Sequence, residues 1–183
     1  MENGKFIVSD TEAGGLSVRY ATPSDASALA GWWNDGAVMA HAGFPHGIGV
    51  TEEEIRESLE KDSDDTRRRF IIEYGKTPIG EMNYNRVDKK TAEIGIKICV
   101  AEYRNKGLGR KALSYLITSL FDSGYETIIL DTDLENKRAQ HVYESLGFVK
   151  LGVRYDSWRD ATGALRSAVD YSLKKPDFIS FLN

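Results

Sequence analysis

VAEYRNKGLGRKA, residues 100–112, places two glycines and four basic side chains between an alternating apolar segment and an apolar helical pattern. Glycine has no Cβ, so the backbone can adopt positive φ and leave several N–H groups unpaired at the start of a helix. These N–H groups and the helix dipole favour an anion such as a pyrophosphate. The basic residues of the turn are Arg104, Lys106, Arg110 and Lys111. The stretch therefore predicts a binding site for a nucleotide-like ligand.

The sequence after this turn predicts a helix, a strand, a second helix and a closing hairpin. Apolar residues recur at helical spacing over residues 107–123, and Gly124 ends the pattern. A buried strand is expected at 127–130, a helix at 136–146, and strands at 148–158 and 168–173. A strand, a helix and another strand in this order predict one crossover unit.

The sequence before the turn predicts helices followed by an antiparallel meander. We expect a strand at 16–20, a helix from about 23 to 33, a loop over 34–50 and a helix from the capping box at 51–54 to residue 60. Strands at 69–74, 77–87 and 91–100 follow, joined by tight turns. This order of elements predicts a mixed α/β layered domain.

Composition restricts the classes of function. The 183 residues fit one domain, and no apolar run approaches the roughly 20 residues of a membrane span. A net charge of -4 argues against nucleic-acid binding. The single cysteine, Cys99, is expected to be a packed strand residue, and its isolation fits a cytoplasmic protein. His41 and His46 lack a third partner at metal-ligand spacing, so we expect no metal.

The glycine turn has three rival interpretations. Gly107-x-Gly109-x-x-Ala112 also satisfies the dinucleotide fingerprint, and Asp131 lies at about the distance of a ribose-binding acid. Against that fold, a meander precedes the turn and too little chain follows it for the remaining parallel strands. A Walker-type P-loop is excluded because the Gly-Lys-Ser/Thr ending is missing. A loop that merely caps a helix explains one glycine, but not two glycines among four cations.

A second motif lies downstream, in the segment DLENKRAQHVYESLGF. Asn136, Ala139 and Tyr143 share one helical face, and Gly147-Phe148 ends the helix. Together with Arg104-x-x-Gly107-x-Gly109, this resembles the GNAT superfamily of N-acetyltransferases, which bind acetyl-coenzyme A (acetyl-CoA). The resemblance is strongest over residues 79–171. Within the superfamily the chain looks most like the branch that holds ribosomal-protein N-terminal acetyltransferases and spermidine acetyltransferases.

The resemblance implies a fold and a division of labour along the chain. The implied fold is a central mixed sheet of about seven strands, splayed between the fourth and fifth and flanked by four helices. Residues 1–183 would form a single domain, with 22–63 on the acceptor side and 91–148 forming the acetyl-CoA core. Strand backbone would align the pantetheine arm, turn N–H groups would hold the pyrophosphate, and a helix asparagine would bind the arm. The implied cofactor-binding residues are Ile98, Cys99, Val100, Arg104, Asn105, Lys106, Gly107, Leu108, Gly109, Arg110, Asn136 and Tyr143.

Acetyl transfer to an amine needs a base, because an alkyl ammonium has a pKa of about 10.4 and is not nucleophilic. The resemblance implies Glu93 as that base, with Glu81 in reserve, and Tyr143 as the acid that protonates the departing thiolate. An equally weighted alternative makes Glu93 a solvated strand residue paired with Lys97 or Arg86. Tyr143 also has a plainer interpretation, as a tyrosine packed in the core.

The acceptor is expected to be an amine, either a small molecule or a peptide: a protein N-terminus, a polyamine, an aminoglycoside or an amino metabolite. The implied acceptor pocket is shaped by Trp32, Trp33, Phe44 and Glu81, although buried tryptophans often serve only the core. Two other classes stay open at this point: an acyl-CoA sensor without catalysis and a nicotinamide-dependent oxidoreductase. The resemblance also allows a homodimer, since many members pair through strands close to the C-terminus.

Overall fold

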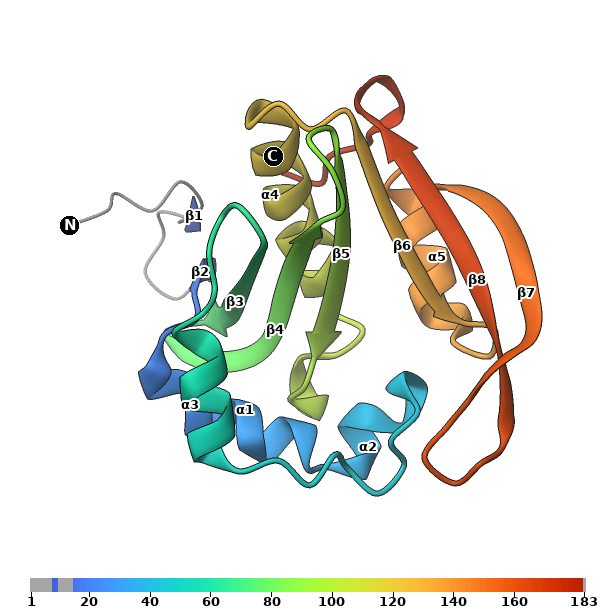
Figure 1. Ribbon diagram of the computed structural model, residues 1–183. Coiled ribbons are helices and arrows are strands. Elements are labelled where there is room, and N and C mark those ends of the chain that lie inside the picture. Colours follow the sequence, from blue (N-terminus) through green and yellow to red (C-terminus); the bar gives the residue numbers. More distant parts are fainter. Residues whose placement is uncertain (1–7, 10–14, 183) are drawn as a thin grey trace.

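The computed structural model describes residues 8–9 and 15–182, which form one mixed sheet with helices on both faces (Figure 1). The strand order is β1-β2-β3-β4-β5-β6-β8-β7. The strands are β1 (Val8–Ser9), β2 (Leu16–Tyr20), β3 (Arg67–Tyr74), β4 (Thr77–Arg86), β5 (Thr91–Ile98), β6 (Thr127–Asp133), β7 (Val149–Arg159) and β8 (Leu165–Lys174). The helices are α1 (Ala26–Trp33), α2 (Gly36–Met39), α3 (Glu52–Leu59), α4 (Leu108–Asp122) and α5 (Lys137–Ser145).

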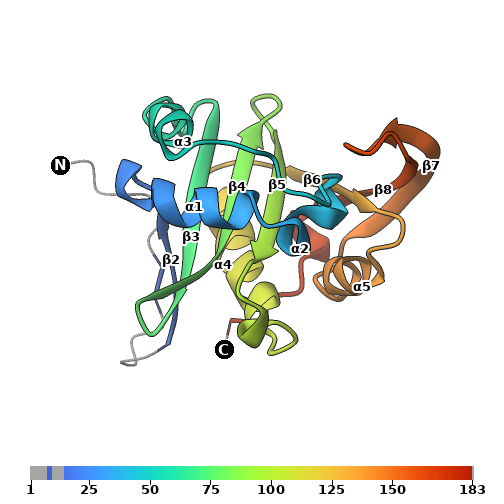
Figure 2. The ribbon, with the colours of Figure 1, turned by 90° about the horizontal axis from the view of Figure 1, so that it is seen from below.

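The two faces of the sheet carry different helices. Seen from below, α1, α2 and α3 lie on one side of the strands, and α4 and α5 lie on the other (Figure 2). Two apolar clusters follow from this arrangement. The larger one joins the sheet to α4 and α5, and the smaller one joins Ile71 of β3 to α1 and α3. Each fully buried aliphatic or aromatic side chain contributes roughly 1.5–3 kcal/mol to folding.

The predicted meander and crossover are confirmed. Strands β2 to β5 pair antiparallel in sequence order, and β6 then pairs with β5 in parallel, with α4 as the connection. The turn between β3 and β4 has Gly75 and Lys76 at φ 57° and 67°, which is the backbone of a two-residue hairpin. The capping box at Thr51 also forms, with Glu54 as its partner.

The splay of the sheet lies between β5 and β6. These strands are paired only over Thr91–Thr127, Ala92–Ile128 and Glu93–Ile129, although β5 continues to Ile98 and β6 to Asp133. Beyond Glu93, alternate peptide groups of β5 therefore point into the gap between β5 and β6, where the two strands are not paired. The implied fold is thus confirmed, with the splay between the fifth and sixth strands because β1 adds a strand at the far edge.

Several boundaries differ from the sequence expectations. The segment 34–50, expected to be a loop, contains α2 and a 3₁₀ turn at Ala40–Ala42, because the Asp35 side chain accepts from the N–H of Ala37 and caps a short helix. Strand β6 runs to Asp133 rather than residue 130, and β8 begins at Leu165. None of the described helices combines the length and apolar character needed to cross a membrane.

Candidate active site

The turn before α4 has positive φ at one of its two glycines, Gly107, whereas Gly109 lies in the first turn of the helix. Gly107 is the N-cap of α4 with φ 77°, and Asn105 also has positive φ, 61°. The first hydrogen bond of the helix runs from the Lys111 N–H to the Gly107 carbonyl. Within the described part of the chain, the backbone N–H groups of residues 105–110 donate to no acceptor. Six consecutive donors thus converge at the positive end of a helix of 15 residues.

The basic side chains around the turn divide into two kinds. Lys106 and Arg110 contact aromatic faces, with Lys106 Nζ 5.6 Å from the Tyr103 ring centre and Arg110 Cζ 4.6 Å from that of Phe181. Arg104 instead points into the protein. Its Nε donates to the Ile98 carbonyl at 3.0 Å and an Nη to the Cys99 carbonyl at 2.8 Å. The Arg104 guanidinium is therefore engaged by backbone, and it fixes the strand end to the turn.

Strand β5 ends in a β-bulge. The N–H groups of Cys99 and Val100 both donate to the Ile79 carbonyl, at 2.8 and 3.1 Å. Because alternate residues of an antiparallel strand bond to its neighbour, the N–H of Ile98 points the other way, into the splay. The Cys99 thiol is buried, and burial raises its pKa to about 12, so it stays protonated.

Helix α5 carries the second motif. The Asn136 side chain accepts from the Ala139 N–H at 3.2 Å and so caps the helix, which leaves its amide NH₂ as a donor. Tyr143 is 6% exposed and packs against the rings of Phe148 and Tyr171, with ring centres 5.8 and 6.0 Å apart. Its hydroxyl has no hydrogen-bond partner among residues 8–9 and 15–182. Burial, followed by the nearby charge of Asp131, raises the pKa of Tyr143 to about 12.

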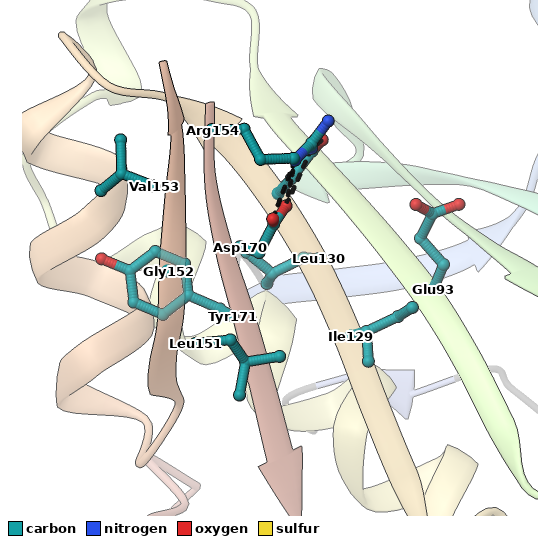
Figure 3. Close-up of a pocket in the computed structure, with 10 residues that line it drawn as sticks. Glu93, Ile129, Leu130, Leu151, Gly152, Val153, Arg154, Asp170 and Tyr171 are labelled. Carbon is teal, nitrogen blue, oxygen red and sulfur yellow. Dashed lines mark hydrogen bonds and ion pairs between the residues drawn. The ribbon is translucent and has the colours of Figure 1, made fainter. Parts of the chain in front are cut away.

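A cavity of about 390 Å³ lies along β6, β7 and β8 and reaches β5 at Glu93 (Figure 3). Its lining includes Glu93 and Ile129, the last pair before the splay. Arg154 of β7 bridges two carboxylates there, Asp131 at 2.6 Å and Asp170 at 2.8 Å. The complete lining is Glu93, Ile129, Leu130, Asp131, Leu151, Gly152, Val153, Arg154, Asp170 and Tyr171.

The two candidate bases have different surroundings. Glu93 receives one hydrogen bond, a long one of 3.4 Å from the Asn85 amide. Its proposed alternative partners are paired elsewhere, Lys97 with Glu81 and Arg86 with an aspartate. Glu81 is 6% exposed and accepts from Trp33 Nε1 at 2.7 Å and from Lys97 Nζ at 3.2 Å. Both bonds to Glu81 end on Oε1, so Glu81 is held in place by two donors, whereas Glu93 is the less engaged of the two carboxylates.

The predicted acceptor residues do not all meet. Trp32 and Trp33 both pack against the smaller apolar cluster, and Trp33 also donates its Nε1–H to Glu81. Phe44 is half-buried in the loop that follows α2. That loop touches the tip of the last hairpin, where the Ala161 N–H donates to the Gly43 carbonyl at 2.8 Å. The loop that follows α2 is thus in contact with the tip of the β7–β8 hairpin.

Two residues of the cavity were missed by sequence reasoning, Arg154 and Asp170. They look like ordinary solvated strand residues, and only the register that pairs β7 and β6 with β8 brings them to Asp131. Alternation along β8 is the signal that would have placed Asp170 on the face of Asp131. Across the described ranges, 8–9 and 15–182, no three His, Cys, Asp or Glu side chains are grouped to hold a metal ion.

Comparison with known proteins agrees with this architecture. The chain is 34% identical over 67 residues to L-amino acid N-acyltransferase MnaT of Escherichia coli, covering 33% of this chain and 39% of that one. It is 34% identical over 99 residues to spermidine N(1)-acetyltransferase of Vibrio cholerae, covering 49% and 53%. The chain thus spans about half or less of the length of the curated relatives it matches.

Solved structures match over more of the chain. A crystal structure of spermidine N-acetyltransferase from Vibrio cholerae, in complex with CoA and spermine, superposes with a TM-score of 0.78 at 23% identity, covering 88% of this chain and 96% of that one. At that identity the likeness concerns the fold. The family model described as an acetyltransferase (GNAT) domain matches residues 16–149, about three quarters of the chain. This protein therefore belongs to the GNAT acetyltransferase family.

Proposed function

We propose that this protein is an N-acetyltransferase, which moves the acetyl group of acetyl-CoA to a primary amine by direct attack in a ternary complex. One observation carries the proposal. The unpaired N–H groups of residues 105–110 adjoin the splayed edge of β5, and that edge leads to a cavity lined by Glu93. The names of the relatives, an amino acid N-acyltransferase and a spermidine acetyltransferase, support the same reaction class.

The residues present fit a diphosphate-bearing thioester. The six turn N–H groups suit the diphosphate, and Lys106 and Arg110 add positive charge beside them. The inward-facing N–H of Ile98 suits an amide of the pantetheine arm, which would then be bound as an added strand. The amide NH₂ of Asn136, at the N-cap of the helix that carries Tyr143, is a further donor. Arg104 contributes by holding Ile98 and Cys99 in place, while its own backbone begins the turn.

The bound donor would supply an activated acetyl group, and Glu93 and Tyr143 would handle the protons. Glu93 lies on the cavity face of the sheet, whereas Tyr143 belongs to the cluster on the α4 and α5 face. The two groups thus approach the strand gap from opposite sides. Glu93 accepts a proton from the acceptor ammonium, directly or through a water molecule, and the neutral nitrogen can then attack the carbonyl carbon. The carbon–sulfur bond breaks, and the electron pair leaves on sulfur.

The high pKa of Tyr143 defines how it assists. A phenol with a pKa of about 12 is protonated throughout the neutral range, so its O–H is always available as a donor. A thiol has a pKa of about 8.5, so outright transfer of the phenolic proton to the thiolate would be unfavourable. We infer that the O–H stabilises the developing thiolate, and that its proton moves to sulfur as the acylated nitrogen gives up its own proton to restore the phenol.

The acceptor side favours a cation. Three carboxylates and one guanidinium line the cavity, so its formal charge is negative. Trp33, held by Glu81, would form one wall, and Trp32 and Phe44 would support the same side. A protein N-terminus, a polyamine and other amines all fit this chemistry. We place the activity in the cytoplasm, where a protonated, unpaired Cys99 is stable.

We also propose a homodimer. Strand β7 lies at the edge of the sheet and exposes Val149, Leu151 and Tyr155, which is a surface that pairing with a second copy would cover. Light scattering at micromolar concentration tests this part independently of activity. A mass of one chain across the accessible concentration range contradicts it.

The experiment that tests the function is release of free thiol from acetyl-CoA with a panel of amines, with the acetylated product identified by mass. Transfer to at least one amine is expected. Calorimetric binding of CoA without transfer to any amine would instead favour a sensor, and saturable binding of NAD without binding of CoA would favour an oxidoreductase.

Two substitutions test the assigned roles. We expect Tyr143→Phe to reduce kcat by about two orders of magnitude or more, as loss of an acid catalyst does, with little change in CoA affinity. Glu93→Gln should reduce kcat by a similar factor at pH 7. The reduction relative to the wild-type protein should be smaller at high pH, where more of the amine is already neutral. Glu81→Gln tests the reserve base in the same assay, and a greater loss of kcat in Glu81→Gln than in Glu93→Gln would assign the role of base to Glu81. Full activity in Tyr143→Phe or Glu93→Gln removes the role of that residue.

A further inference from the structure

Arg110 is a cation in an unfavourable place. It is the third residue of α4, where the helix dipole and the unpaired N–H groups already make the field positive. Among the described residues it has no carboxylate partner. Side chains of a helix lean toward its N-terminus, so we expect Arg110 to lean toward the turn that precedes α4. The local field disfavours a guanidinium at this position, and no ion pair among the described residues offsets that cost. A bound anion would offset it.

The guanidinium is held by a segment that is distant in sequence. Residues 178–182 pass from the end of α5 to α4, and in Figure 2 the C-terminal end of the chain lies beside α4. The Ile179 N–H donates to the Leu146 carbonyl at 3.0 Å, which attaches this segment to the end of α5. Phe178 lies against Phe121 of α4, with ring centres 5.9 Å apart. The segment is thus anchored to both helices.

A single buried hydroxyl connects that segment to the turn of helix bearing Arg110. The Phe181 N–H donates to Ser114 Oγ at 3.0 Å, and Ser114 Oγ donates in turn to the Arg110 carbonyl at 2.9 Å. Ser114 is fully buried, and the two bonds of its hydroxyl are part-buried. This relay fixes the Phe181 ring beside Arg110, whose guanidinium carbon lies 4.6 Å from the ring centre. A cation at that distance from an aromatic face is attracted to it and loses side-chain freedom.

We propose that Phe181 is a positioning residue, which orders Arg110 in advance for the diphosphate end of the donor. The inference rests on the proposed function, since it names how that site holds the phosphates. Stacking leaves the guanidinium N–H groups free at the edge of the plane, where they can donate to phosphate oxygens. Because the side chain is already ordered, less conformational entropy is lost when the anion binds.

The test is a double-mutant cycle on ligand binding, measured by calorimetry with CoA and with pantetheine, which lacks the phosphates. Phe181→Leu keeps an apolar side chain but removes the ring face, and Phe181→Trp keeps a face. Arg110→Gln removes the charge. We expect Phe181→Leu to weaken CoA binding about three- to fivefold, which matches the usual strength of a cation–π contact, with pantetheine binding unchanged. Phe181→Trp should restore CoA binding, and Arg110→Gln should abolish the effect of Phe181→Leu.

The outcomes separate the two proposals. Equal CoA binding by the wild-type protein and Phe181→Leu, or equal weakening of CoA and pantetheine binding, overturns the role of Phe181 and leaves the proposed function intact. An effect of Phe181→Leu that persists in the Arg110→Gln background also overturns it, because the ring would then act through packing. Tighter CoA binding by Phe181→Leu would show that the segment obstructs the site. A wild-type protein that binds neither ligand contradicts the proposed function itself.

Discussion

Replacement of Arg104 by alanine distinguishes a structural arginine from a phosphate ligand. The guanidinium donates to the carbonyls of Ile98 and Cys99 at 3.0 and 2.8 Å, so the substitution removes two hydrogen bonds from a charged donor. Such bonds are worth about 1.5–3 kcal/mol each, and water that enters the half-exposed site recovers part of this. We expect a loss of about 2–3 kcal/mol in the free energy of unfolding.

Thermal unfolding followed by circular dichroism measures this loss. For a chain of this length 1 kcal/mol shifts Tm by about 2–4 °C, so Arg104→Ala should lower Tm by roughly 4–12 °C. Lys106→Ala is the matched control, because Lys106 is an exposed cation of the same turn whose ammonium lies over the Tyr103 ring. It should change the free energy of unfolding by less than about 0.5 kcal/mol. Arg104→Lys should fall between the two, since an ammonium cannot span both carbonyls.

One pattern of results would contradict a structural role for Arg104. If Arg104→Ala unfolds at the same temperature as Lys106→Ala and yet binds CoA more weakly in a salt-dependent way, the guanidinium is a phosphate ligand. The expected pattern is the reverse. Tm falls for Arg104→Ala alone, and its loss of CoA affinity extends to pantetheine, because the displaced strand end serves the whole arm.

Three further predictions concern stability. A Cβ on Gly80 would lie 2.2 Å from the Lys97 carbonyl oxygen, so Gly80→Ala should lower the free energy of unfolding in urea by about 1–3 kcal/mol. Gly109→Ala is the control: the nearest atom to its Cβ would be at 3.8 Å, so it should not lower the free energy of unfolding. Burial opposes ionisation of Asp25, but hydrogen bonds from Arg19 and the Thr22 N–H outweigh it and lower the Asp25 pKa. Asp25→Asn should therefore destabilise at pH 7, and this difference should shrink as pH falls below about 4; a constant difference would contradict the shift. The Asp133 side chain is 1% exposed and paired with arginine, so Asp133→Asn should lower the free energy of unfolding by about 3 kcal/mol by the same urea assay; an unchanged urea midpoint would refute it.

Much of the fold was predictable because its signals are local. The spacing of apolar residues in α4, the alternation along β5 and the capping box at Thr51 depend on neighbours within a few residues, and each element forms as expected. The glycine turn belongs to the same class, since positive φ at Gly107 follows from the residue type. The loop at 34–50 was mispredicted because one side chain, Asp35, is enough to cap a short helix there.

The candidate site was only partly predictable. Glu93 and Tyr143 were named from motifs, and their surroundings were not. That Glu93 lines a cavity while Glu81 is engaged by Trp33 depends on a helix and two strands far apart in the sequence. The direction of Arg104 was also unexpected, because a basic residue beside an anion-binding turn has the same sequence signature whether it faces the ligand or the backbone.

By itself, the sequence determined the class of the protein: a mixed α/β domain with a glycine-containing turn between β5 and α4, for which it predicted anion binding. Only the tertiary structure decided which charges remain available to a ligand. Arg154 forms ion pairs with two aspartates, and Arg104 donates to a carbonyl at the end of β5. Arg110 stacks on Phe181 and has no counter-ion among the described residues. The physical reason is the distance in sequence over which each property is determined. Backbone conformation follows from side chains a few positions away, whereas the partner of a charge is set by whichever segments the packed sheet and helices bring within hydrogen-bond distance.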